Sequence, residues 1–408
     1  MSVKLGIAPI AWSNDDMPEL GGDTPLEQCL SEASLAGFQG IESGGKFPKT
    51  SQELIPILSK YNLNLCSGWY GANLRKNTFK EEKDKIQNQL KLFKDCNAPC
   101  IVFAEVYGSI QGDLHTKLSE RPKMDLEESK KYYKKISEMG KYLEDQAMPL
   151  AYHHHMGTCI ESEEDTRKLL ENTDNSVKLT LDTGHMLFAR GDSLKIYKEF
   201  KERIIHIHCK DMRKNILDKS LQNDYSFRKA FLEGAFTVPG DGCIDYKPFF
   251  DLLKVQNYSG WLVVEAEQDP AKANPLEYAK IGHKYLTETL KLSNVEIDTS
   301  PGIFFAVTMQ NLTANTRIVV ILTKNGNNTY TNFDGLTPNN EGFVTHYINV
   351  GGSANWNGTV NEVNFRFKQG GGVNNNVFSG DILIDHIEIV DAIPVSYTHL
   401  RAHETVLD

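Results

Sequence analysis

Hydrophobic and polar positions follow a repeating order along the first part of the chain. Short apolar runs are each followed by longer amphipathic stretches rich in Lys and Glu, which is typical of alternating strands and helices. The apolar runs predict strands at 4–10, 37–43, 63–69, 100–106, 149–155, 177–183, 204–210 and 261–267. Helices are predicted between them, for example over 79–96 and over 24–37, where Thr24 is the expected N-cap and Pro25 the first helical residue.

The number of repeats decides between two α/β folds. Eight strands, each followed by a helix, match a (β/α)8 TIM barrel. A doubly wound sheet is the alternative, but no glycine-rich dinucleotide-binding turn follows the first predicted strand. We therefore expect a TIM barrel over residues 1–292.

The pattern changes after residue 293. Charged residues become sparse, Asn and Gly become frequent, and β-branched residues alternate with polar ones, as in RIVVILTK and DILIDHIEIV. Residues 298–392 therefore predict a small all-β sandwich segment. The last stretch, 395–408, has no periodicity, and we expect it to belong to neither part.

Charge and cysteine content exclude some classes of protein. The 408 residues carry 44 Lys and Arg against 54 Asp and Glu, a formal net charge of −10. Binding to nucleic acid is not expected, because such proteins usually present a basic face. No stretch approaches the ~20 apolar residues of a membrane span, so no membrane association is expected. The seven cysteines show no zinc spacing or paired framework, which favours reduced thiols in a cytoplasmic protein.

Polar side chains end many of the predicted strands, and strand ends are where a TIM barrel forms its active site. They are Glu42, Glu105, the run His153 to His155, Asp182 with His185, His206 with His208, and Glu265 with Glu267. Residues two apart on a strand share a face, so each such pair points the same way. Imidazole with carboxylate is a ligand set of divalent transition metals such as Mn²⁺, Co²⁺ or Zn²⁺. The strand ends therefore predict a metal site.

Longer motifs surround these positions. They are GIAPIAWSNDDMPELGG, GIESGGKFP, AYHHHMGT, LDTGHMLFARGD, HIHCKDM, FTVPGDGCIDY and GWLVVEAEQDP, spread over residues 1–292. Together they resemble the inosose dehydratase (2-keto-myo-inositol dehydratase) family of the xylose-isomerase-like barrel superfamily. The resemblance implies a metal-dependent lyase of inositol catabolism. Its substrate would be a cyclic polyol ketone, scyllo-inosose, dehydrated to a trihydroxycyclohexane-1,2-dione. Barrels of this superfamily often associate, which leaves a homo-oligomer open.

The resemblance also implies a ligand set. The superfamily holds a divalent ion, here expected to be Mn²⁺ or Co²⁺, with four side chains from the last four strands. Asp182, His208 and Glu265 match three of these positions, and His153 stands where the superfamily usually has Glu. Glu267 is an alternative to Glu265, because both acids lie on one face.

The implied reaction needs further groups. A base must take the proton beside the ketone, an acid must protonate the departing hydroxyl, and a metal stabilises the enolate. His155, His185 and Glu105 are the candidates for acid and base. Lys46 is expected to bind a substrate oxygen or the enolate, with a solvated loop lysine as the alternative.

Two other segments have two interpretations each. The run VPGDG at 238–242 is either a substrate or lid loop or a plain connection. Lys210 and Asp211 either position the substrate beside the metal or pair with each other.

Two other functions fit part of the pattern. A metal-dependent ketose epimerase or isomerase of the same superfamily would use the same metal with two acid/base carboxylates, and HHHMGT in place of Glu-x-His counts against it. In a non-catalytic sugar-binding protein the ligand set would have no catalytic role, and the presence of the full set counts against this alternative.

The C-terminal part resembles something else. Residues 298–392 are similar to the C-terminal part of a jelly-roll, carbohydrate-binding-like module, and residues 395–408 look like translated sequencing-adaptor read-through. A cytoplasmic barrel, an incomplete module and the lack of a Pro- or Ser-rich linker together suggest that two parts were joined artificially.

Overall fold

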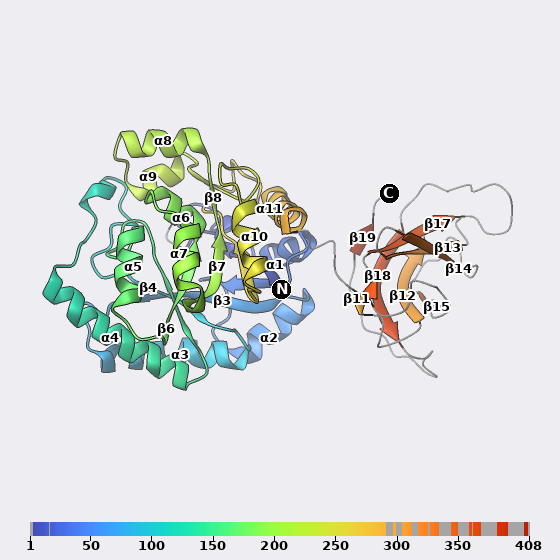
Figure 1. Cartoon of the computed structure of the whole chain (residues 1–408), viewed down its shortest axis with the longest axis horizontal. Coiled ribbons are helices and arrows are strands. Elements are labelled where there is room, and N and C mark those ends of the chain that lie inside the picture. Colours follow the sequence, from blue (N-terminus) through green and yellow to red (C-terminus); the bar gives the residue numbers. More distant parts are fainter. Residues whose placement is uncertain are drawn as a thin grey trace. The chain divides into compact units, whose positions relative to one another are not determined.

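The computed structural model describes residues 3–15, 17–290, 297–298, 304–311, 317–324, 327–333, 344–349, 359–360, 362–368, 382–390 and 404–406. The chain divides into two compact units, Met1–Leu290 and Lys291–Asp408. Within the described residues, every helix belongs to the first unit and the second contains only strands (Figure 1).

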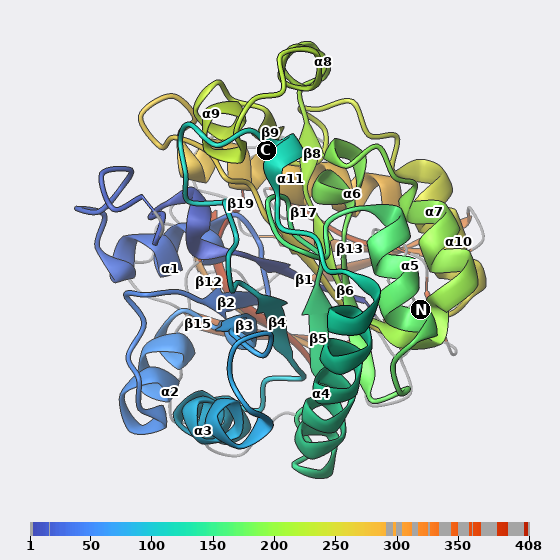
Figure 2. The same cartoon turned by 90° about the vertical axis from the view of Figure 1, so that its left-hand side faces the viewer.

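Eight parallel strands close into a barrel in the first unit. Their order around the barrel is β1-β10-β7-β6-β5-β4-β3-β2. Their bounds are β1 (Val3–Ile7), β2 (Gly40–Ser43), β3 (Asn64–Ala72), β4 (Ile101–Glu105), β5 (Leu150–His153), β6 (Val177–Asp182), β7 (Ile204–Cys209) and β10 (Gly260–Val264). Each overlaps one predicted strand, which confirms the TIM barrel. Figure 2 shows the strands at the centre with helices around them.

Helices follow the barrel strands and cover them. They are α1 (Leu26–Leu35), α2 (Ser51–Lys60), α3 (Phe79–Asp95), α4 (Leu126–Asp145), α5 (Glu163–Glu171), α6 (Thr183–Phe188), α7 (Ser193–Phe200), α10 (Lys247–Val255) and α11 (Pro275–Leu290). Short 3₁₀ turns lie at η1 (Pro9–Ala11), η2 (Leu118–Glu120) and η3 (Lys201–Arg203). After β7, a two-stranded ribbon of β8 (Asp211–Met212) and β9 (Phe236–Thr237) encloses α8 (Lys214–Gln222) and α9 (Phe227–Leu232). The alternation of the sequence did not predict this insertion.

Amphipathic spacing explains how these helices pack. In α3, the buried Ile86, Leu90 and Phe93 recur at helical intervals, so one stripe faces the barrel. The Thr78 side chain and Glu81 form a capping box that starts this helix, and the predicted bounds are confirmed to within one residue.

The predicted start of the first helix is wrong by one to two residues. Helix α1 begins at Leu26, and Pro25 is its N-cap with extended φ and ψ of −64° and 149°. Thr24 lies one residue before the N-cap, where its amide donates to the carbonyl of Gly21 and its own carbonyl accepts from Lys46. The chain before α1 is therefore a closed turn rather than a helical first turn.

The second unit consists of antiparallel sheets. One has the order β15-β12-β18-β19, one β14-β13-β17, and β11 pairs with β16. The bounds are β11 (Ile297–Asp298), β12 (Phe304–Asn311), β13 (Arg317–Lys324), β14 (Asn327–Phe333), β15 (Val344–Asn349), β16 (Thr359–Val360), β17 (Glu362–Lys368), β18 (Ile382–Val390) and β19 (Glu404–Val406). Residues Ile318–Leu322 of β13 are all buried and form a core. The predicted all-β character is confirmed.

Strand β19 lies within the stretch 395–408 that the sequence set apart. Its three residues pair with Ile382–Ile384 of β18. The other residues of that stretch lie outside the described ones. That the stretch is not native remains a prediction.

Two further observations concern the cysteines and the helices. All seven cysteines are free thiols. Among the described residues, no helix has the length and apolar character needed to cross a membrane.

Candidate metal centre and active site

Four side chains meet at the carboxyl ends of β5, β6, β7 and β10. The Nε2 of His153 lies 3.1 Å from the Nδ1 of His208, and each nitrogen is 3.5 Å from Asp182 Oδ2. Glu265 Oε2 lies 3.2 Å from His208 Nδ1. One ligand atom from each residue lies within 4.8 Å of every other. We call this set, His153, Asp182, His208 and Glu265, the four-residue cluster; it is the set that the sequence predicted as metal ligands.

Local structure fixes Asp182 in the four-residue cluster. Its Oδ1 accepts from the His185 amide at 2.7 Å, so Asp182 is the N-cap of α6. Its own amide donates to His154 Nε2 at 3.2 Å. The motif LDTGH therefore ends a strand and starts a helix, and Oδ2 is left to face the histidines.

The donor set of this cluster fits a divalent ion. Asp182 and His208 are almost wholly buried, yet Asp182 Oδ2 accepts no hydrogen bond from the described residues. Buried acceptors without partners are rare and need compensation. Two imidazoles and two carboxylates are suitable ligands for Mn²⁺, Co²⁺ or Zn²⁺.

Lys210 gives this region a permanent positive charge. Its ammonium is 1% exposed and lies 2.7 Å from Glu265 Oε2, 2.9 Å from Glu267 Oε2 and 2.9 Å from His185 Nε2. Burial would raise the pKa of Asp182, but Lys210 and the neighbouring imidazoles hold it well below its usual value. Ion pairs with Lys210 thus hold the carboxylates of Glu265 and Glu267 in place.

Lys210 and Asp211 do not pair with each other. Asp211 Oδ1 instead accepts from the amides of Met212 and Ile244, at 2.7 and 2.9 Å. Asp241, within VPGDG, accepts from Arg213 at 2.8 Å and from Thr237 at 2.6 Å. These contacts favour the plain connection over the lid as the interpretation of VPGDG.

Close packing against Lys210 explains a glycine of the LDTGH motif. A Cβ on Gly184 would lie 2.6 Å from Lys210 Cγ and 2.9 Å from its Cβ. The aliphatic part of Lys210 crosses directly over this backbone, so a side chain at position 184 would collide with it.

A second group lies beside the four-residue cluster. His155, His185 and Glu267 also offer ligand atoms within 4.8 Å of one another. The rings of His155 and His185 have centroids 4.0 Å apart, and His155 Nε2 lies 3.9 Å from Glu267 Oε1. Glu267 therefore belongs to this second group and Glu265 to the four-residue cluster, which separates the two acids that the sequence left open.

The protonation of His155 follows from its contacts. Its Nδ1 is 2.8 Å from the Met156 carbonyl, and a carbonyl only accepts, so Nδ1 carries the proton. Burial, with the nearby His153, lowers the pKa of His155 to about 3, which keeps the ring neutral. Its Nε2 thus has a free lone pair. Burial raises the pKa of Glu267 to about 7 although Lys210 opposes the shift.

Glu105 is in a different environment from its predicted partners. Its carboxylate accepts from the amides of Arg75 and Tyr107, at 3.2 and 3.1 Å. Burial raises its pKa to about 7, with the two amides and the Arg75 charge opposing that shift. No contact among the described residues joins Glu105 to either histidine group.

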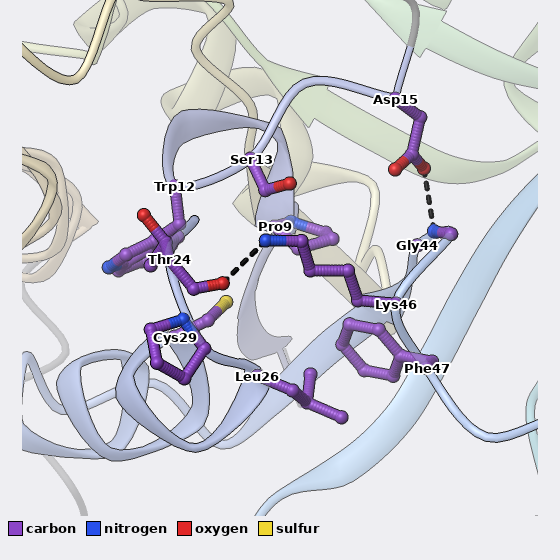
Figure 3. A pocket seen from close by; sticks show the side chains of 12 residues that line it. Pro9, Trp12, Ser13, Asp15, Thr24, Leu26, Cys29, Gly44, Lys46 and Phe47 are labelled. Carbon is purple, nitrogen blue, oxygen red and sulfur yellow. Dashed lines mark hydrogen bonds between the residues drawn. The ribbon is translucent and has the colours of Figure 1, made fainter. Parts of the chain in front are cut away.

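Lys46 closes a loop. Its ammonium donates to the carbonyls of Gly21, Gly22 and Thr24, at 3.2, 2.6 and 2.5 Å. Figure 3 shows Lys46 in a small pocket beside Cys29 and Thr24, with Asp15 binding the backbone next to it. Among the described residues, no contact joins Lys46 to the four-residue cluster, so the structure does not bring it to the predicted site.

Two neighbours of the site received no role from the sequence. Glu42 accepts from both His206 and His208, at 2.9 and 3.2 Å. Trp69 is 37% exposed, and its ring meets those of His153 and His155 edge-on at 5.4 and 5.5 Å. Glu42 was noted as a strand end but without partners, whereas Trp69 looked like one more apolar strand residue.

The chain is similar to a known protein family and to several known proteins. The family model described as xylose isomerase-like TIM barrel matches residues 30–289. Inosose dehydratase of Clostridium tetani is 43% identical over 288 residues, 70% of this chain and 97% of the relative. That of Geobacillus thermodenitrificans is 43% identical over 292 residues, 71% and 98% of the two chains. The rhizopine catabolism protein MocC of Rhizobium meliloti is 41% identical over 312 residues, 76% and 96%.

Two solved structures have the same fold. One is the IOLI protein with a binding zinc atom, with a TM-score of 0.54, 16% identity, and coverage of 71% of this chain and 98% of that one. The other is the probable 3-DHS dehydratase AsbF from Bacillus anthracis, with a TM-score of 0.52, 16% identity, and coverage of 70% and 98%. At this level of identity the likeness concerns the fold.

The family follows from the family model and the relatives together. The model covers more than half of the chain, and the two dehydratases match it at 43% identity over nearly their whole length. The resemblance predicted from the sequence motifs is thereby confirmed. This chain belongs to the xylose isomerase-like TIM barrel family and, within it, to the inosose dehydratases.

Proposed function

We propose that the barrel removes water from scyllo-inosose (2-keto-myo-inositol) and releases a trihydroxycyclohexane-1,2-dione. The observation that carries this proposal is the 43% identity to inosose dehydratases that the chain covers almost completely. The arrangement of imidazoles and carboxylates at the strand ends supports it, because the reaction needs an acid, a base and stabilisation of an enolate.

His153, Asp182, His208 and Glu265 would hold the divalent ion. The unpartnered Oδ2 of Asp182 supports this assignment, as do the His153 and His208 nitrogens that face it. We propose Mn²⁺ or Co²⁺, which accept this mixed nitrogen and oxygen set. When bound, such an ion supplies Lewis-acid stabilisation of negative charge on a substrate oxygen.

The second group would move the protons. His155 has a free Nε2 lone pair, and its Nδ1 proton is held by the Met156 carbonyl, so it can accept the proton from the carbon beside the ketone. The departing hydroxyl needs a proton in turn, and Glu267, whose pKa burial raises to about 7, is the candidate to give it. The other expected acid, His185, accepts from the Lys210 ammonium at Nε2, so this nitrogen carries no proton. Lys210 orients both of them through contacts of 2.9 Å.

Trp69 would bind the substrate ring. Its exposed indole lies beside His153 and His155, and a scyllo ring with equatorial hydroxyls presents C–H groups on its faces. Aromatic side chains pack well on such apolar faces.

The decisive assay uses the purified full chain, stripped with a chelator and then supplied with Mn²⁺ or Co²⁺. We expect conversion of scyllo-inosose to the dione only after the metal is returned, and no reaction of a linear ketose. Epimerisation of the ketose without dehydration of the inosose would favour the epimerase alternative. Binding of the inosose with no turnover under any metal would favour the sugar-binding alternative.

We also propose that the enzyme works in the cytoplasm. All seven cysteines are free and five are buried, which suits a reducing compartment. Fractionation of cells that express the chain, with antibody detection, tests this directly; recovery in a secreted fraction would contradict it.

A further inference from the structure

Glu42 connects two histidines across the interior of the barrel. It lies on β2, whereas His206 and His208 lie on β7, and in the order of the sheet β1 and β10 stand between these strands. A single oxygen, Oε1, lies 2.9 Å from His206 Nε2 and 3.2 Å from His208 Nε2. All three side chains are at most 7% exposed. This is an interaction through the core rather than between neighbouring strands.

The two ring nitrogens of His208 face different partners. Nδ1 faces His153, Asp182 and Glu265 in the four-residue cluster, while Nε2 faces Glu42. Carboxylates face both nitrogens, because Nδ1 lies 3.2 Å from Glu265 Oε2 and Nε2 lies 3.2 Å from Glu42 Oε1. A ligating Nδ1 gives its lone pair to the ion, so the proton of the neutral ring then lies on Nε2, which donates it to Glu42.

We propose that Glu42 is a positioning residue that fixes His208 as the Nε2–H tautomer and so directs its Nδ1 lone pair into the metal centre. The inference rests on the proposed function, because it takes His208 as a metal ligand. A second hydrogen bond of this kind commonly fixes the ring orientation and raises the basicity of a ligating histidine.

His206 supports the same carboxylate. Residues 206 and 208 lie on one face of β7, so both rings point to the same side of the strand. By donating to Oε1 at 2.9 Å, His206 prevents Glu42 from turning away from His208 and stabilises the buried carboxylate. Both histidines thus restrict Glu42 to one orientation.

The first test measures metal affinity with the full chain. In Glu42→Gln the carboxylate becomes an amide, and we expect Co²⁺ to bind about ten- to a hundredfold more weakly. The matched control is Glu82→Gln: Glu82 is also buried and accepts two hydrogen bonds, from Tyr70 and Asn77, but outside the site. We expect this control to bind Co²⁺ as the unaltered chain does. Equal Co²⁺ affinity in Glu42→Gln and the unaltered chain would overturn the inference.

The second test needs no variant, so it holds even if Glu42→Gln folds poorly. Long-range ¹⁵N–¹H spectra of histidine-labelled protein with Zn²⁺ bound report which nitrogen of each ring carries the proton. We expect Nε2–H for His208, and a spectrum with Nδ1–H would overturn the inference. An unaltered chain that binds neither Co²⁺ nor Zn²⁺ would instead refute the metal site of the proposed function, which separates the two failures.

Discussion

Replacing Glu105 by Gln tests whether this carboxylate is a structural or a catalytic group. It lies at the end of β4, where the sequence predicted an acid or base, but its oxygens bind the Arg75 and Tyr107 amides. Turnover by Glu105→Gln should therefore stay close to that of the unaltered enzyme, while the pH dependence of stability should change.

The size of that change follows from the pKa of Glu105. Burial raises it from 4.5 to about 7, and each unit corresponds to about 1.4 kcal/mol. Between these two values the folded protein keeps a proton that the unfolded chain has lost, so unfolding becomes easier as the pH rises and levels off above about 7. Gln cannot ionise. The variant should thus gain about 3 kcal/mol relative to the unaltered chain between pH 4 and pH 8. At pH 4 it should be about 1 kcal/mol less stable, because one oxygen cannot replace two acceptors.

Urea unfolding followed by far-ultraviolet circular dichroism measures this, since every described helix lies in the barrel unit. Glu138→Gln, which changes an exposed carboxylate, is the control and should follow the unaltered chain at each pH. If the free energy of unfolding depended on pH in the same way for Glu105→Gln and the unaltered chain, burial would not raise the pKa of Glu105. A collapse of kcat would refute the structural assignment.

Three further substitutions have distinct expected outcomes. His155→Gln should lower kcat by about 10²- to 10⁴-fold with bound metal unchanged by elemental analysis, and unaltered kcat would exclude His155 as the base. Lys46→Met removes three contacts to carbonyls and should lower the free energy of unfolding by about 1 kcal/mol with kcat unchanged, whereas Lys49→Met, which loses one contact of 3.3 Å, should do less. A lower kcat in Lys46→Met would show that Lys46 takes part in the reaction. Trp69→Leu should raise KM more than it lowers kcat, and a reduced metal affinity would contradict its role as a substrate wall.

The barrel was predictable because its determinants are local. Each core strand contains a short apolar run, and many of these runs are ended by a polar residue, a pattern that can be recognised without knowledge of the fold. The insertion of α8 and α9 was not predictable in the same way. Its helices cover residues between β7 and β9 that interrupt the strand–helix order, so periodicity alone could not assign them to the barrel or to a loop.

The site was predictable to the extent that motifs carry it. The strand ends predict a metal site, since parallel strands bring their carboxyl ends together. The choice of the four ligands within it came from the resemblance to the family. The contacts of Lys46 and Glu42 depend instead on how distant parts of the chain meet in the folded barrel. Lys46 meets Gly21, and Glu42 meets His206, a residue 164 positions away. No pattern near either residue indicates these contacts, and only the folded loop and the closed barrel create them.

The crossing of Lys210 over Gly184 has a consequence for how this family can vary. The placement of the Lys210 ammonium depends on Gly184, which has no side chain. Removing side chains one at a time would therefore not reveal the importance of Gly184, because this residue has no group to lose. There the informative change is an addition, because a methyl group at 184 would come within 2.6 Å of the lysine stem. The two positions therefore form a size-matched pair. Relatives with a larger residue at 184 are expected to have a shorter one at 210, and the two should change together in evolution.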